Sequence, residues 1–148
     1  MLGVFRLGGC ASNPSIERNK RMTQRVFVEV LNQGRLQLFD EIYSPDFVKH
    51  VDGRTRTLAQ ERLDTQSTRA ALSDLVVTVD ALIAERDKVA VLYTGRGTNT
   101  GPISGLPPKG HHLEISGMTV YRFAGGKIVE EWTVYNELEI LRQMGHYP

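Results

Sequence analysis

The feature that most limits the possible folds is a change of sequence pattern near residue 74. Before it, apolar residues recur at helical spacing; after it, β-branched runs alternate with short polar or Gly-rich turns. The runs predict strands over residues 75–84, 89–100, 111–123 and 128–136. Helices followed by an antiparallel meander predict an α+β fold and not a wound parallel sheet, and a curved sheet would leave room for a pocket at its mouth.

The helical half is divided by turn signals. Asn13-Pro14 pairs an N-cap residue with proline at the first helical position, and it predicts a helix that ends at 32–34. A short second helix follows over 36–43, then a short strand over 47–51 and a turn over 52–55. Residues 57–72 suit a third helix, and a last one starts near Leu138 and ends at Gly145.

Length and composition fit one globular domain. The chain has 148 residues, 41% of them hydrophobic, and a net charge of +1, which argues against a nucleic-acid-binding role. We therefore expect a flexible leader over 1–13 and a single domain over 14–148. The longest apolar runs, such as 89–93, are far shorter than the ~20 residues of a membrane-spanning helix. These features predict a cytoplasmic protein.

The leader leaves one alternative open. Leu7-Gly8-Gly9-Cys10-Ala11-Ser12 resembles a bacterial lipobox, but Arg6 interrupts the short apolar stretch before it. Cys10 is the only cysteine, so it can form no internal disulfide. The favoured interpretation is a free thiol. The alternative is a protein that is lipid-anchored through Cys10, if the true start lies upstream.

Two chemical motifs are weak. Gly95-x-Gly97-x-x-x-Gly101 has the wrong spacing for a dinucleotide fingerprint and leads into a loop. On one strand only His112 and Glu114 of the His-His-x-Glu group can converge, so no metal site is predicted.

Two segments of the C-terminal half are specific. They are the Gly-x-Pro-Pro-x-Gly loop at 105–110 and the strand Gly-Lys-Ile-Val-Glu-x-Trp at 126–132. Together with the N-terminal segment "FVEVLNQGRLQLFDEIYSPDFVKH", they make the chain resemble the SnoaL-like polyketide cyclase family over roughly 16–145. This resemblance implies the nuclear-transport-factor-2-like fold, a cone-shaped barrel of strongly curved, mostly antiparallel sheet wrapped on N-terminal helices, with a pocket at its open end.

The resemblance also implies a chemistry. Family cyclases close a ring of an aromatic polyketide by intramolecular aldol condensation, without metal or organic cofactor. They use an aspartate in the pattern Trp-x-x-x-Asp as acid/base. Here Trp132 is followed by Asn136 at that position, and an amide cannot act as a general base. The resemblance therefore implies the fold and a pocket, but not the cyclase mechanism.

The hairpin between the last two strands decides which side chains join Asn136. A three-residue loop, Ala124-Gly125-Gly126, would pair Phe123 with Lys127. A two-residue turn at Gly125-Gly126 would instead shift the register by one and bring Tyr121 and Thr119 beside Trp132. We favour the three-residue loop, because related cyclases place polar pocket residues at two positions of the face that it creates. That face would hold Met118, Val120, Arg122, Trp132 and Asn136.

The predicted site combines these residues with two from other strands. His50 would be the base, with Asn136 and Arg122 holding developing negative charge. Trp132, Tyr93, Met118 and Val120 would bind a small hydrophobic substrate. Glu130 would be another base if it pointed inward.

Three functions compete on this basis. They are a cofactor-independent cyclase or isomerase of a polyketide-like carbonyl compound, a non-catalytic binder of small hydrophobic ligands, and an interaction module. We expect a homodimer or a higher even homo-oligomer, paired through the outer sheet face.

Overall fold

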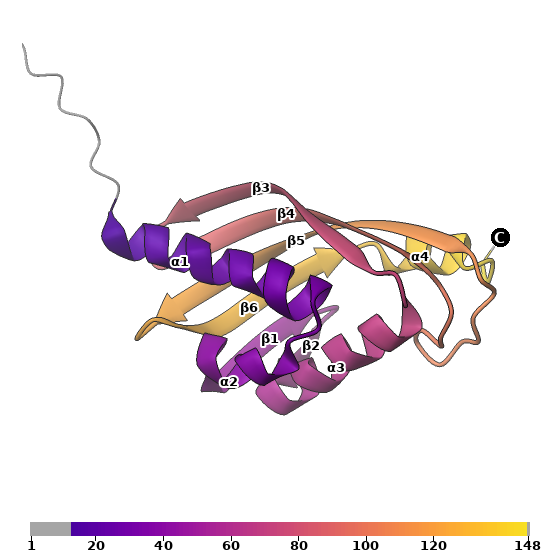
Figure 1. Cartoon of the computed structure of the whole chain (residues 1–148), viewed down its shortest axis with the longest axis horizontal. Coiled ribbons are helices and arrows are strands. Elements are labelled where there is room, and N and C mark those ends of the chain that lie inside the picture. Colours follow the sequence, from indigo (N-terminus) through magenta and orange to yellow (C-terminus); the bar gives the residue numbers. More distant parts are fainter. Residues whose placement is uncertain (1–12, 148) are drawn as a thin grey trace, which may run out of the picture.

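A six-stranded curved sheet covered by helices on one face forms the body of the protein. The computed structural model describes residues 13–147. The strand order is β2-β1-β6-β5-β4-β3, and all neighbours are antiparallel except β1 and β6, which run parallel. Figure 1 shows α1 crossing the sheet, with α2 and α3 beside it. The predicted α+β architecture is therefore confirmed.

The first helix follows the sequence prediction closely. α1 (Pro14–Arg25) begins at Asn13, whose side chain accepts a hydrogen bond from Ser15 N. It continues as the π-helix η1 (Val26–Asn32), and Gly34, at φ +70°, follows the end. π-helical turns are rare and occur frequently at functional sites.

The next segment differs from the prediction in where its strands lie. The second helix consists of η2 (Leu36–Leu38) and α2 (Phe39–Ile42), and β1 (Tyr43–Val51) starts four residues earlier than expected. Its pairing with β6 shifts between Tyr43 and Val48, so the proline in this stretch interrupts no regular ladder. β2 (Arg54–Thr57), placed in a turn by the sequence, pairs with β1 through a tight Asp52-Gly53 turn.

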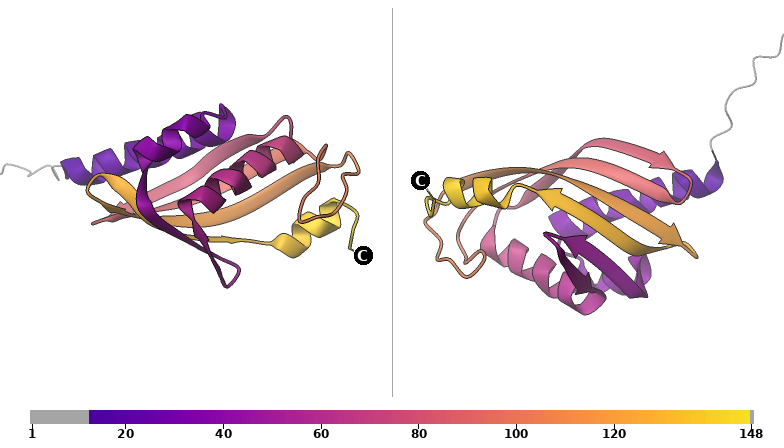
Figure 2. Two further views of the ribbon diagram at one scale, coloured as in Figure 1. Left: turned by 90° about the horizontal axis from the view of Figure 1, so that it is seen from below. Right: turned by 180° about the vertical axis from the view of Figure 1, so that it is seen from behind.

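The remaining elements match the predicted order. α3 (Leu58–Ala71) starts with a capping box between Thr57 and Gln60. The meander consists of β3 (Val76–Glu85), β4 (Lys88–Thr98), β5 (His112–Ala124) and β6 (Lys127–Tyr135), and α4 (Glu137–Gln143) ends the fold. Figure 2 shows α4 at the far end of the sheet from the start of α1.

The hairpin between β5 and β6 corrects the preferred turn. Ala124 pairs with Lys127, so the turn has two residues, Gly125 and Gly126, both at positive φ (58° and 83°). Only glycine adopts such a pair of angles without strain, which explains the shorter turn. An irregularity after Arg122 leaves Val129 unmatched and cancels the register shift that this turn would cause. Val120 and Trp132 therefore still share a face, as predicted, although the loop length behind that prediction was wrong.

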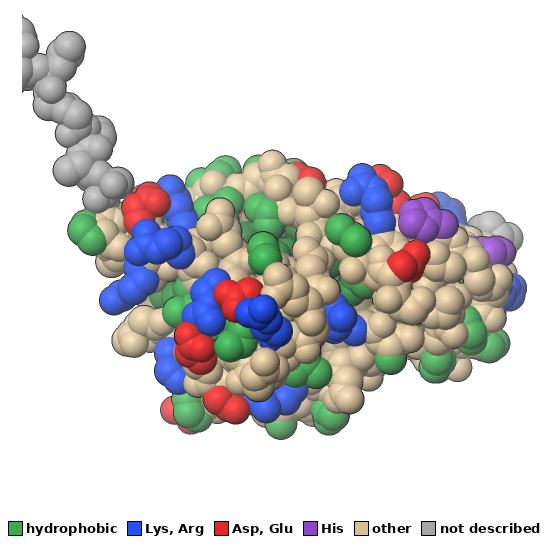
Figure 3. Space-filling view, in the orientation of Figure 1, with side chains coloured by type: hydrophobic (Ala, Val, Ile, Leu, Met, Phe, Trp, Pro, Cys, Tyr) green, Lys and Arg blue, Asp and Glu red, His purple; other side chains and the backbone are tan. Residues whose placement is uncertain are grey.

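The two sheet faces have different surroundings. The inner face packs on the helices and buries, among others, Val91, Tyr121, Phe123 and Ile128. The outer face leaves several large apolar side chains exposed. Figure 3, which shows the helix-covered side, has acidic and basic side chains interspersed over α1 and α2. Within that mixture Arg25 pairs with Glu29 and Glu41.

Two further expectations concern membrane-spanning helices and the leader. No helix among residues 13–147 is long and apolar enough to cross a membrane. The expected leader, including Cys10, lies outside these residues except for Asn13.

Candidate functional site

A cavity of about 500 Å³ lies between the inner sheet face and the helices. Part of its wall is apolar and comes from η1, β3 and the inner face, including Phe27, Val30, Leu31, Val77, Ile115 and Tyr121. Another part is polar and buried, and comes from Lys49, Glu61, Thr119, Glu131 and Thr133. Exposed residues of the β1–β2 hairpin and of the loop before β5, such as Asp52 and Ser104, also line it. Such a cavity has the size and mixed lining of small-molecule sites.

The polar part is a cluster of one cation and two carboxylates. Lys49 Nζ lies 3.0 Å from both carboxylate oxygens of Glu61 and 3.1 Å from Glu131 Oε1. The side chains of Lys49, Glu61 and Glu131 are only 15%, 10% and 4% exposed. Burial without partners would be costly, so the two carboxylates depend on Lys49 and Lys49 depends on them.

The topology explains why these residues meet. Parallel pairing of β1 with β6 sets Lys49 directly beside Glu131, and alternation along both strands turns the two side chains inward. Glu61 reaches the same point from the first turn of α3, where a carboxylate is favoured by the helix dipole. The three positions span more than 80 residues of sequence.

Two threonines orient Glu131. Thr133 Oγ1 donates to Glu131 Oε1 at 2.6 Å, and Thr119 Oγ1 lies 2.7 Å from Thr133 Oγ1. Glu131 Oε2 is buried and has no hydrogen-bond partner among the described residues. One carboxylate oxygen is thus held in place, while the other is left without a hydrogen-bond partner among the described residues.

The cluster changes the proton affinity of its members. Burial raises the pKa of Glu61, and neighbouring Glu131 raises it further against the lowering effect of Lys49, so that it reaches about 7. Burial lowers the pKa of Lys49, but Glu131 and Glu61 outweigh burial and hold it well above the ordinary value. Lys49 therefore stays charged and cannot act as an amine nucleophile, whereas Glu61 can hold or release a proton near neutral pH.

Tyr93 also lines the cavity, where the sequence places it among the substrate-binding residues. Its ring packs against Phe27, with the centroids 5.7 Å apart, and burial raises its pKa to about 12. It therefore remains a neutral hydroxyl donor. A Cβ at Gly117 would lie only 2.4 Å from its hydroxyl oxygen, so this glycine makes room for the Tyr93 hydroxyl over β5.

The other sequence-predicted site residues lie outside the cavity lining. Met118, Val120, Arg122 and Trp132 share one face, as expected, and that face is the outer one. His50 joins them there and stacks on Trp132, with the ring centroids 5.3 Å apart.

Glu130 completes this outer cluster. Its carboxylate lies 2.9 Å from His50 Nε2 and 2.8 Å from Arg122 Nη2. Hydrogen bonds from His50 and then from Arg122 lower the pKa of Glu130. The predicted catalytic pair His50 and Arg122 is therefore brought together, but on the face opposite the cavity.

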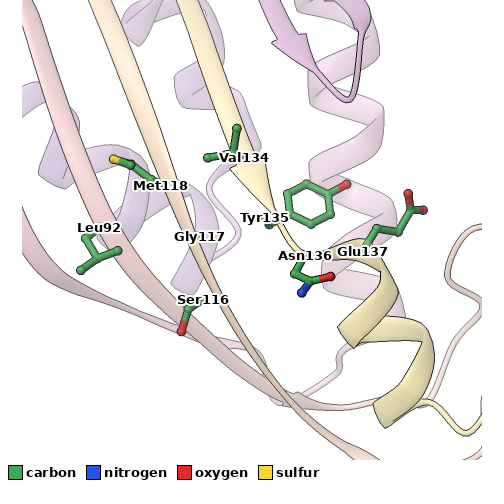
Figure 4. Close-up of a pocket in the computed structure, with 8 residues that line it drawn as sticks. All are labelled: Leu92, Ser116, Gly117, Met118, Val134, Tyr135, Asn136 and Glu137. Carbon is green, nitrogen blue, oxygen red and sulfur yellow. The ribbon is translucent and has the colours of Figure 1, made fainter.

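Asn136 lies at the start of α4 and not, as expected, in the lining of the cavity. Its exposed side chain caps α4, because Oδ1 accepts a hydrogen bond from Glu139 N at 3.1 Å. It also borders a shallow outer groove of about 440 Å³ with Leu92, Ser116, Met118 and Val134. Figure 4 shows Tyr135 pointing away from these groove residues. Residues 13–147 hold no group of three or more metal-ligating side chains.

Lys49, Glu61 and Glu131 are not among the site residues predicted from the sequence. Lys49 precedes the histidine that was singled out, and Glu131 follows the glutamate considered as a base. Their signal is the alternation of the two paired strands, which becomes informative only once the inner face is known.

A curved α+β barrel with an internal cavity and a buried acid/base cluster defines a class of small-molecule pocket proteins. The sequence model of the family described as "SnoaL-like polyketide cyclase" matches residues 21–144. The chain therefore belongs to the SnoaL-like polyketide cyclase family, and the resemblance is confirmed.

Solved structures agree with this assignment. AclR of Streptomyces galilaeus, a proposed hydroxylase, has a TM-score of 0.81 and 27% identity over 90% of this chain and 99% of its own. IdmH of Streptomyces antibioticus, a proposed polyketide cyclase, has a TM-score of 0.74 and 28% identity over 86% and 98%. A Jannaschia protein at 22% identity shares the fold, with a TM-score of 0.86 over 95% and 100%. No curated protein matches the chain significantly.

Proposed function

We propose that the protein is a cofactor-independent acid/base enzyme that acts on a hydrophobic polyketide-like carbonyl compound in the internal cavity. The observation that carries this proposal is Glu131, whose carboxylate is oriented through one oxygen and unpartnered at the other inside a largely apolar chamber. The assignment of IdmH as a proposed cyclase is consistent with it.

In the proposed reaction Glu131 accepts a proton and Glu61 donates one. Glu131 Oε2 would remove a proton from a carbon next to a carbonyl group, and the enolate carbon would attack a second carbonyl of the same ligand. Glu61, protonated near neutral pH, would give its proton to the resulting alkoxide. The hydroxyl of Tyr93 would hold the enolate oxygen. The ligand gains a C–C bond, its proton count is unchanged, and Lys49 offsets the charge throughout.

The first half-reaction can be tested without knowing the natural substrate. A bicyclic aromatic β-keto ester should exchange its acidic proton in D₂O faster with the protein than without it. Glu131→Gln should reduce the enzymatic exchange about 10²–10⁴-fold. Glu130→Gln and His50→Gln are matched controls on the outer face and should retain it. Loss of exchange in His50→Gln but not in Glu131→Gln would favour the site of His50, Arg122 and Asn136 instead.

A non-catalytic ligand-binding protein is the second candidate. It is favoured by the mutual neutralisation within the cluster, since Lys49 contacts both carboxylates. Saturable binding of the β-keto ester with no exchange above background would support this alternative.

The expected homodimer or higher even homo-oligomer belongs to this proposal too, and the outer face favours the dimer. Four apolar side chains of the outer face are well exposed, namely Leu92 (46%), Met118 (46%), Val134 (62%) and Trp132 (37%). Pairing of two such faces would remove them from water. Light scattering should give about twice the 16.6 kDa chain mass, and Val134→Glu should give the single-chain mass.

A further inference from the structure

The deep end of the cavity holds two carboxyl groups and one cation. With both carboxyl groups ionised, the buried cluster has a net charge of −1; while Glu61 holds its proton, Lys49 and Glu131 balance, and Glu131 is the negative group at this end. At the exposed mouth, Asp52 and Glu137 add acidic groups. A ligand therefore meets acidic groups along its path and at its end.

The cations of the lining offer little to an anion. Lys49 already faces two carboxylates at 3.0 and 3.1 Å. The Nε of Arg56, on β2, forms an ion pair with Asp64 Oδ2 at 3.2 Å, although the contact lacks the geometry of a hydrogen bond. Arg54 is exposed at the mouth and belongs to the β1–β2 hairpin rather than to the deep end.

At the deep end, an acceptor oxygen of Glu131 lacks a hydrogen-bond donor within residues 13–147. Glu131 Oε1 receives the Thr133 hydroxyl, while Glu131 Oε2 is buried without a partner. A ligand N–H or O–H would satisfy that oxygen, whereas a ligand carboxylate would place like charges together. An ammonium group would instead approach Lys49, which lies 3.1 Å from the other oxygen of Glu131.

We infer that the cavity selects uncharged ligands that donate a hydrogen bond to Glu131 Oε2, and that it rejects carboxylates of the same shape. The inference rests on the proposed function only in taking the cavity to be the ligand site. It requires no turnover.

Three probes of one shape test this selection. Calorimetric titration would compare 2-naphthamide, 2-naphthoate and 2-naphthylmethylammonium on the full chain in one buffer. The amide should bind at least about tenfold more tightly than either charged probe. Equal or tighter binding of the carboxylate or the ammonium probe would overturn the inference, while binding by none of the three would overturn the ligand cavity itself.

Variants then assign the effect to Glu131. Glu131→Gln keeps the side-chain shape and removes one charge, so it should bring the amide-to-carboxylate ratio to within about threefold. Glu130→Gln, one residue earlier on the outer face, should leave the ratio unchanged. An unchanged ratio in Glu131→Gln would refute the assignment. If that variant does not fold, Glu61→Gln, compared with the wild type at a pH above about 7 where Glu61 is ionised, removes one charge from the other side of Lys49 and should also reduce the ratio; an unchanged ratio there would refute the assignment equally.

Discussion

Replacing Lys49 by methionine tests whether the buried cluster depends on its one cation. The substitution keeps most of the aliphatic stem but leaves Glu61 and Glu131 in contact with no positive charge, at 10% and 4% exposure. Removing one partner of a buried ion pair costs about 3–5 kcal/mol of unfolding free energy. For a domain of this size that corresponds to a fall in Tm of roughly 6–20 °C.

The assay is urea unfolding followed by circular dichroism. Lys88→Met, which removes an exposed lysine 3.4 Å from Asp87, is the matched control and should change stability by less than about 1 kcal/mol. The triple variant Lys49→Met/Glu61→Gln/Glu131→Gln should recover much of the loss, because no unpaired buried charge remains. The deficit of Lys49→Met should also shrink as the pH falls and the carboxyl groups take up protons. A loss below 1 kcal/mol, or a deficit that is independent of pH, would refute the reasoning.

Three further predictions follow from single contacts. Glu61 holds a proton in the folded state between its ordinary pKa of 4.5 and about 7, so the protein should lose stability as pH rises through that window; Glu61→Gln should flatten the slope in urea unfolding at several pH values. Gly117→Ala forces Tyr93 to move and should cost about 1–3 kcal/mol, measured in the same way. Asn136→Ala should lower the free energy of unfolding by about 1 kcal/mol, because the cap of α4 is lost. Asn136→Asp should keep the cap and the stability. Its proton exchange on the β-keto ester should equal that of the wild type, because the side chain at position 136 faces the helix end.

Local sequence signals predicted the elements well. The Asn13 cap and the glycine after η1 act over a few residues, so their effect can be read without knowing the tertiary structure. The glycines before β6 marked a turn, but its favoured length was wrong. The grouping of Val120 with Trp132 was predicted from a turn of the wrong length, and it holds because the bulge at Val129 offsets the shorter turn. β2 was missed because its four residues, Arg-Thr-Arg-Thr, contain no apolar residue to mark a strand.

The identity of the inner face was not predictable in the same way. On β6 the outer residues Trp132 and Val134 are large and apolar, whereas the inner residues Glu131 and Thr133 are polar. Simple patterning would bury the first pair. The structure shows the opposite: Glu131 and Thr133 are buried in the cavity wall, whereas Trp132 and Val134 are exposed on the outer face.

The bulge at Val129 determines which glutamate of β6 enters the cavity. Without it, the two-residue turn would align Thr119 with Trp132, and the register would turn Trp132 toward the helices and Glu131 outward. With it, Glu131 meets Lys49, and Glu130 meets His50 and Arg122. Two adjacent carboxylates thereby acquire different environments, one buried with an unpartnered oxygen and one on the outer face with both oxygens paired. That difference is why the pair Glu130→Gln and Glu131→Gln separates cavity chemistry from effects of the outer face.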